Sequence, residues 1–181
     1  RVVLAIIAND EMVRLQRLVA IEMLQDFKRV VDANVERVGL LGLAKDLARF
    51  FLANRFYPEA LAAIDAFLHD NPAGADDSNL LIVRALANIL GGAPEQGLKD
   101  LASPAIGTGY DSRLWRALAN ARLGKWGEAR ELFKGVDYAI GALPIELQRI
   151  VIVDALRASL EVRDYAGVSS PVNELQLVAI A

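Results

Sequence analysis

The chain contains no cysteine and a single histidine, His69, so the side chains that most often ligate transition metals are almost missing. Without cysteine, a disulfide, a thiolate metal site and a cysteine nucleophile are all excluded. His69 has no second histidine and no cluster of carboxylates at ligand spacing beside it. Its position fits the end of a helix, where an imidazole meets free carbonyl groups.

Ser-His-Asp catalysis would need His69 as its base, but the chain has no Gly-x-Ser-x-Gly turn. We therefore predict a protein that is not an enzyme, with no catalytic residue, no cofactor and no metal site.

An excess of positive charge is missing as well. The net charge is -3 and the isoelectric point about 5.2, so no basic field attracts phosphate groups, and nucleic acid is excluded as a main partner.

Long apolar runs are also missing. The run at residues 2–8 is far shorter than the roughly 20 residues of a membrane span, and it lacks the length and cleavage pattern of a signal peptide. Because the chain begins at Arg1 and ends on an apolar tail, we expect a piece of a longer protein, and cytoplasm and envelope both stay open.

What the chain does have is a high share of apolar residues in helix-length segments. Hydrophobic residues make up 54% of its 181 residues and charged residues 24%, which is typical of a folded globular domain with a buried core. Apolar residues recur three and four positions apart, and no segment shows the sustained alternation of a strand. Short breaks with glycine or proline separate these segments. We therefore predict an all-α protein.

The breaks divide the chain into a long N-terminal helix and four helix pairs. Residues 1–38 form the N-terminal arm and helix, and residues 39–181 form one array within a single structural domain. Asp77 or Ser78 offers a helix cap, and Pro58 suits the first turn of a helix. The predicted pairs occupy residues 41–74, 77–106, 111–140 and 144–181.

Each pair carries the same three-residue device at its turn. A small or polar residue is followed two positions later by an aromatic residue or proline, and three positions after that by a small residue. The four instances are Arg55, Tyr57 and Ala60; Gly92, Pro94 and Gly97; Gly124, Trp126 and Ala129; and Arg163, Tyr165 and Val168. A helix pair of this length cannot bury its apolar face alone, so neighbouring pairs must stack.

Residues 41–74 resemble the tetratricopeptide repeat, a 34-residue helix-turn-helix with the pattern Trp-x2-Leu-Gly-x2-Tyr, then Ala-x3-Phe, then Pro. The positions that carry the resemblance are Ala44 at the Trp place, Leu47 and Ala48 at the Leu-Gly pair, Phe51 at the Tyr place, and then Ala60, Ile64, Phe67 and Pro72. Alanine is small where two helices cross closely, and the phenylalanines fill the space around that contact. The resemblance implies an α-α superhelix of about four tetratricopeptide-like hairpins, of the divergent bacterial type.

The third pair matches the pattern in two pieces, and the second and fourth match it loosely. The matching residues of the third pair are Trp115, Leu118 and Ala119, and then Gly124, Trp126, Ala129 and Phe133. Arg122 occupies the Tyr place there, while Arg84 and Asp154 fall where the second and fourth pairs should be apolar. Both tryptophans are interpreted as packing residues, Trp115 within and between hairpins and Trp126 at its turn.

The first helix of each pair lines the concave face in tetratricopeptide arrays, so the resemblance implies a binding groove there. The predicted groove residues are Lys45 and Arg49 in the first pair, Ile82 and Leu86 in the second, and Arg113, Arg116 and Asn120 in the third. The cations suit an acidic peptide or a C-terminal carboxylate, and the apolar middle suits a partner helix. A solvated helix face is the alternative interpretation of the cations.

We therefore predict a non-enzymatic protein-interaction scaffold that binds a peptide or partner helix in its groove. The alternative is a structural or oligomerisation module of a larger envelope or regulatory protein, with a groove filled by its own N-terminal helix. The apolar run at residues 150–153 favours association, because it places branched residues on every side of its helix. A continuation of the chain, a second copy in a homo-oligomer, or residues 173–181 would have to cover it.

Overall fold

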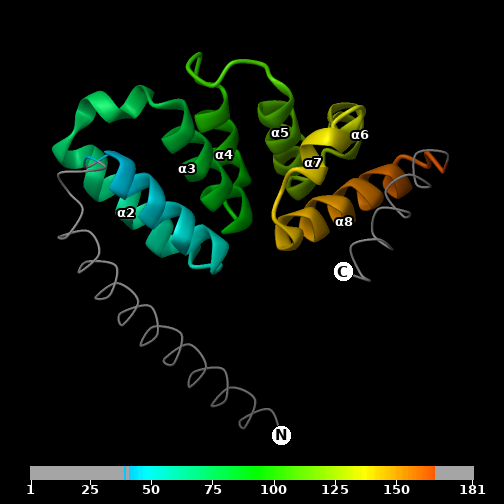
Figure 1. Ribbon diagram of the computed structural model, residues 1–181. Helices are drawn as coiled ribbons and strands as arrows, with labels where there is room; N and C mark the ends of the chain where they lie inside the picture. Colours follow the sequence, from blue (N-terminus) through cyan, green and yellow to red (C-terminus); the bar gives the residue numbers. More distant parts are fainter. Residues whose placement is uncertain (1–38, 40, 166–181) are drawn as a thin grey trace, which may run out of the picture.

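Every element in the described part of the computed structural model, residue 39 and residues 41–165, is helical, and no strand occurs there (Figure 1). The predicted all-α fold is confirmed. The elements are a first helix over residues 41–53, α2 (Tyr57–Asp70), the 3-10 helix η1 (Pro72–Asp76), α3 (Ser78–Leu90), α4 (Pro94–Leu101), α5 (Tyr110–Arg122), α6 (Trp126–Phe133), α7 (Asp137–Gly141) and α8 (Ile145–Glu161). The predicted helix within residues 1–38 and most of the predicted second helix of the fourth pair, residues 166–181, lie outside the described residues.

Successive helices form hairpins that stand side by side (Figure 1). The first hairpin is the helix over residues 41–53 with α2, the second is α3 with α4, and the third is α5 with α6. The helix α8 lies where the first helix of the fourth pair was predicted. Each new first helix packs against the second helix of the preceding hairpin: α3 on α2, α5 on α4 and α8 on α6. The short α7, which the sequence analysis did not separate from its neighbours, packs against α5 and α8. Stacking therefore joins the hairpins into one array.

Local signals set several of the helix starts. The Asp77 side chain accepts a hydrogen bond of 2.9 Å from the Leu80 N–H and caps α3, so the first of the two predicted caps is the observed one. Pro58 lies in the first turn of α2 and Pro94 begins α4. Proline lacks the N–H group that would be unpaired at these positions, so both prolines favour a helix start there.

Four helices end with the same backbone geometry: the helix over residues 41–53, α3, α5 and α8. The residue that carries this geometry in each is called the turn residue. The turn residues have positive φ angles: 63° at Arg55, 94° at Gly92, 72° at Gly124 and 60° at Arg163. In each case the next N–H group donates back to the carbonyl five residues earlier. These bonds are Phe56 to Phe51 (2.9 Å), Ala93 to Asn88 (2.7 Å), Lys125 to Asn120 (2.9 Å) and Asp164 to Ser159 (2.9 Å). This is the Schellman closure of a helix, so the shared device in the sequence corresponds to one repeated turn.

Small residues lie where the two helices of a hairpin cross. A methyl group built on Gly97 of α4 would lie 2.5 Å from the Ile89 Cγ1 and 2.8 Å from the Ala85 carbonyl oxygen of α3, so the backbones approach too closely for a larger residue. Ala60 and Ala129, the corresponding residues of α2 and α6, are fully buried. The predicted small position is thus confirmed in three hairpins, and Val168 of the fourth lies outside the described residues.

Both tryptophans pack as the sequence predicted. Trp115 is buried in the continuous core between the hairpins. Trp126 is half-buried, with its indole beside Gly124, and the Arg157 guanidinium of α8 lies 4.9 Å from its ring centroid. Cation–π contact of this kind holds α8 against the third turn.

Candidate functional site

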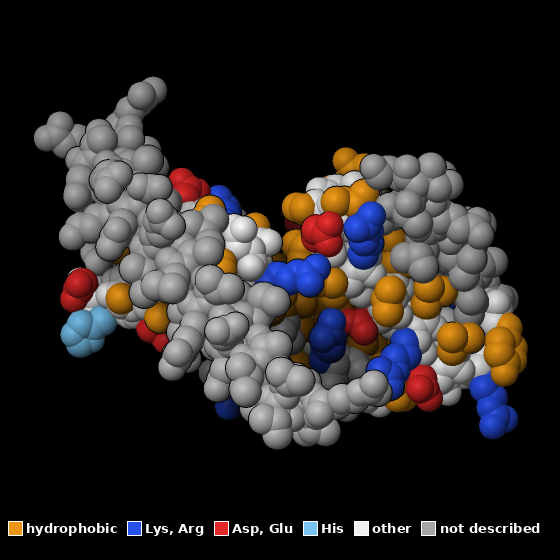
Figure 2. Space-filling model, turned by 90° about the horizontal axis from the view of Figure 1, so that it is seen from below, with side chains coloured by type: hydrophobic (Ala, Val, Ile, Leu, Met, Phe, Trp, Pro, Cys, Tyr) orange, Lys and Arg blue, Asp and Glu red, His pale blue; other side chains and the backbone are white. Residues whose placement is uncertain are grey.

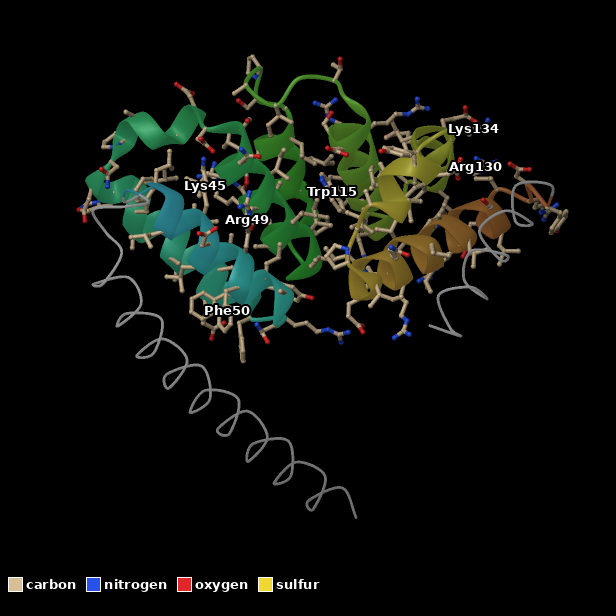
Figure 3. All side chains as sticks on the ribbon, viewed as in Figure 1. Lys45, Arg49, Phe50, Trp115, Arg130 and Lys134 are labelled. Carbon is tan, nitrogen blue, oxygen red and sulfur yellow. The ribbon has the colours of Figure 1, made fainter. Side chains whose placement is uncertain are left out.

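The first helix contributes two of the predicted groove cations, and they differ in their surroundings (Figure 3). The Lys45 Nζ lies 2.7 Å from the Asp77 Oδ2 in an ion pair between the first and second hairpins, with both side chains largely buried. Arg49 is exposed, and its Nη1 lies 3.6 Å from the Asp46 Oδ1. Of these two cations, Arg49 is therefore the more accessible to a partner.

Asp77 combines this ion pair with its capping role, and its pKa is shifted as a result. Burial raises the pKa of the carboxyl, but the hydrogen bond from Lys45, the backbone N–H groups of Leu80 and Asn79 and the charge of Lys45 outweigh burial, so the pKa is lowered below its usual value. A carboxyl with a lowered pKa in the folded state stabilises the fold above the pKa of the unfolded chain, and this contribution disappears as the pH falls through the folded pKa.

Asp77→Asn tests this contribution, because asparagine still caps the helix but loses the charge. We expect the variant to be less stable than the wild type at pH 7 by about 1 kcal/mol. Below about pH 3.9, the usual pKa of an unfolded aspartate, the difference should shrink and then vanish. Urea unfolding across this pH range measures it. The neighbouring Asp76 is exposed, and Asp76→Asn serves as the matched control; an equal loss in both variants would contradict the assigned role of the ion pair.

The two arginines predicted for the third hairpin donate to backbone carbonyls at helix ends. Arg113 donates from its Nε to the Leu132 carbonyl (3.0 Å) and from its Nη2 to the Glu131 carbonyl (2.8 Å), in the last turn of α6. Arg116 reaches the Leu101 carbonyl at the end of α4 (2.6 Å) with its Nη2. Free carbonyls at a helix C-terminus favour cationic donors, so both guanidinium groups have a structural use.

The remaining predicted groove residues lie against the core. Leu86 is buried, Ile82 is half-buried against the core, and the buried Asn120 donates to the Arg116 carbonyl at 3.0 Å. The seven residues therefore do not form one open strip, since internal contacts occupy most of them. Their predicted part in binding a partner stays a prediction, and Arg49 is the one with an exposed side chain.

Polar residues that depart from the tetratricopeptide pattern have partners inside the fold. Arg122 of α5 pairs with Asp154 of α8, with its Nε 2.8 Å from the Oδ2, so the deviations in the third and fourth hairpins compensate each other. Arg84 of α3 binds both carboxylate oxygens of Asp100 on α4, at 2.6 and 3.2 Å. Asn88 donates to the same carboxylate at 3.3 Å. In the described part of the chain, every buried side-chain nitrogen or oxygen has a hydrogen-bond partner.

An open cleft of about 510 Å³ lies between the turn of the second hairpin and the end of α5, and we call it the turn cleft. It is lined by Ile89, Gly92, Ala93, Pro94, Glu95, Gln96, Lys99, Arg122 and Leu123. Figure 2 shows the molecule from below, the side on which the α3–α4 turn lies in Figure 1, and this side is hollowed near its middle, where basic, acidic and hydrophobic side chains lie together. The sequence analysis missed this cleft. The repeated turn device was the available signal, because it brings equivalent turns of neighbouring hairpins to one side of the array.

Curvature of the array brings distant segments together on the same side. The Arg55 Nη2, at the first turn, lies 3.4 Å from the Glu146 Oε2 in the first turn of α8, although 91 residues separate them. The first and fourth hairpins therefore approach each other across the turn side of the array. Between them, the turn cleft offers an apolar floor with charged groups at its edge.

The described residues contain no group of three or more His, Asp or Glu side chains that could hold a metal ion. Within the same part of the chain, no helix combines the length and apolar character that crossing a membrane requires. No protein-family model matches the chain, and neither a curated protein nor a solved structure matches it. The turn cleft itself presents apolar side chains and charged groups.

Proposed function

We propose that the protein is a tetratricopeptide-like interaction scaffold without catalytic activity, which binds an extended peptide or a partner helix. The observation that supports this proposal most directly is the fourfold repetition of one turn geometry in a stacked array of hairpins. Curved arrays of stacked helix pairs present extended binding surfaces, since each repeat adds side chains to the same side. A protein or peptide, rather than a small metabolite, is therefore the expected ligand.

The turn cleft is the binding site that we propose on this array. Its volume of about 510 Å³ falls in the range of roughly 300 to 1,000 Å³ typical of ligand sites. Pro94 and Leu123, both half-buried, provide apolar surface for a side chain of the ligand. Arg122 is already held by Asp154, whereas Lys99 is exposed and its Nζ donates to the neutral Gln96 Oε1 at 3.3 Å. Lys99 is therefore the cation best placed to attract an acidic group of a peptide.

Selection of random peptides against the folded protein, followed by affinity measurements, tests this proposal. Peptides that bind the turn cleft should carry an acidic residue next to an apolar one. Lys99→Glu should weaken their binding by about tenfold or more, because it replaces attraction by repulsion. Lys134→Glu is the matched control: it makes the same charge change at an exposed lysine of the third hairpin that does not line the cleft. Equal binding by Lys99→Glu and the wild type would rule out this site.

The alternative role, an assembly module, is favoured by a different observation. Apolar side chains of α8, including Val153 and Leu160, are exposed among the described residues, although the sequence analysis expected residues 150–153 to be buried on all sides. Exposed apolar side chains that gather in one patch often mark a protein interface. For the assembly role to hold, a second copy of the chain would have to cover these side chains.

A further inference from the structure

A second pocket lies beside the turn cleft, and we call it the Tyr57 pocket. It has a volume of about 110 Å³. Its lining includes Tyr57, Pro58 and Leu61 from the first hairpin and Ala87, Gly91 and Ala93 from the second. Ala93, which is exposed, lines the turn cleft as well. Because one residue of the second turn borders both sites, a single ligand can occupy them together.

The Tyr57 pocket and the turn cleft are the same site of the array, formed twice. Each is lined by the residues two and three positions after one turn residue and by the residue one position before the next. These residues are Tyr57, Pro58 and Gly91 in the Tyr57 pocket, and Pro94, Glu95 and Leu123 in the turn cleft. Stacked repeats place such equivalent surfaces in a row.

The third hairpin shows what this surface can bind. Its equivalent of Tyr57 and Pro94 is Trp126, and the Arg157 guanidinium of α8 lies 4.9 Å from the ring centroid of Trp126. A side chain from the following helix thus lies on this surface within the fold. At the first two turns, the pockets offer the corresponding surface to a side chain of a ligand.

The two pockets differ in charge. In the Tyr57 pocket, the Asn88 side chain is buried and donates to Asp100 at 3.3 Å, so the surface left for a ligand is mainly apolar and aromatic. The turn cleft has the exposed Lys99 in its lining, whereas its other cation, Arg122, is held by Asp154. Charge complementarity therefore favours an acidic group in the cleft and an uncharged side chain in the Tyr57 pocket.

We propose that the array binds an extended peptide that places one apolar side chain in the Tyr57 pocket and another, next to an acidic residue, in the turn cleft. This inference rests on the proposed function and adds the register of the ligand. Since Ala93 borders both sites, they lie about one helix-packing distance apart, roughly 8 to 10 Å. Residues i and i+3 of a polyproline II segment share one side and lie roughly 9 Å apart. The two apolar residues of the peptide are therefore three positions apart.

Peptides selected from a random library against the folded protein are the probes for this register. Leu61 is half-buried, and Leu61→Asn makes a wall of the Tyr57 pocket polar. We expect this variant to bind the peptides about tenfold more weakly, because one apolar side chain loses its contact. Pro58→Ser changes an exposed residue of the same pocket, and it should weaken binding about threefold with little effect on folding.

Leu98→Asn is the matched control for Leu61→Asn. Leu98 is the equivalent residue of α4, six positions after its turn residue, and it is also half-buried but lines neither pocket. The control should leave the affinity within about twofold of the wild type. Alanine in place of the peptide's apolar residue that enters the Tyr57 pocket completes a double-mutant cycle. It should weaken binding to the wild type about tenfold and binding to Leu61→Asn far less, since that contact is already lost.

The outcomes separate this inference from the proposed function. Peptides that depend on Lys99 but bind Leu61→Asn and Pro58→Ser as tightly as the wild type would overturn the inference and leave the turn cleft as the whole site. Additive losses in the cycle would also overturn it, because the peptide's apolar residue would then lie elsewhere. Equal losses in Leu61→Asn and Leu98→Asn would assign the effect to the stability of the fold, which urea unfolding measures, and would overturn it too. Selection of no peptide that depends on Lys99 would contradict the proposed function itself, and this inference with it.

Discussion

Trp115→Ala is expected to lower the free energy of unfolding by about 3 to 5 kcal/mol, the range for removing a fully buried tryptophan. The indole is only 5% exposed and belongs to the continuous core of the array. Its removal leaves a cavity among side chains of neighbouring helices, which cannot close it because α5 is held on both sides by α4 and α6. Urea unfolding followed by circular dichroism measures the loss, and the variant should retain the fold at low temperature.

Trp126→Ala is the matched comparison, because it removes the same side chain from a half-buried position. The expected loss is smaller, about 1 to 2 kcal/mol, part of which is the contact with the Arg157 guanidinium. The order of the two variants is the decisive result. Equal losses in Trp126→Ala and Trp115→Ala would contradict the difference in burial between the two indoles.

The turns were predictable because their chemistry is local. Gly92 and Gly124 adopt positive φ angles, which glycine does at no steric cost, and both mark reversals in the sequence. Arg55 and Arg163 also adopt positive φ angles, and propensity alone would not place them there. Their equivalence became visible only by comparing all four hairpins, since the residues that follow, such as Tyr57, align with Pro94 and Trp126. Repetition in a sequence thus supplies information that a single turn lacks.

The positions of the cations were only partly predictable. Helical periodicity tells which face a residue occupies, but it does not tell which segment of the chain reaches that face. Arg113 and Arg116 were predicted to face a partner, which stays a prediction, and in the structure they donate to carbonyls at the ends of α6 and α4. Those carbonyls come from neighbouring helices whose ends the sequence places only within a few residues. An arginine has five N–H donors. Free carbonyl groups at a nearby helix end therefore compete with a ligand for these donors.

The turn cleft escaped prediction for a related reason. Its lining comes from the second turn, from α4 and from the end of α5, and no single segment shows an unusual pattern. Lys99 and Arg122 come together only because the third hairpin stacks on the second at a particular angle. Arg122 occupies the Tyr place of the tetratricopeptide pattern and so departs from it. Its ion pair with Asp154, at 2.8 Å, explains the departure. Pairs of anomalies one repeat apart are therefore a usable signal in divergent arrays.

Arg84→Met is expected to be the most damaging single change in the second hairpin. It leaves the Asp100 carboxylate, whose side chain is 5% exposed, without its bidentate partner. Breaking a buried ion pair from one side costs about 3 to 5 kcal/mol, since the remaining charge cannot regain its water. Asp100→Leu should cost less, because the Arg84 side chain that remains is 26% exposed and can turn its guanidinium towards solvent.

The double variant Arg84→Met with Asp100→Leu separates this charge effect from simple loss of packing. Apolar residues of similar size often replace a buried ion pair without loss, so the double variant should be more stable than Arg84→Met alone. Only the Asn88 amide, which donates to Asp100 at 3.3 Å, loses its acceptor, and this limits the recovery. Urea unfolding of the three variants and the wild type gives the coupling free energy. Additive losses would mean that the two side chains do not interact, in contradiction to the 2.6 Å contact between them. A large coupling would show that α3 and α4 are joined by a buried polar cluster, a feature that no pattern of apolar residues could have revealed.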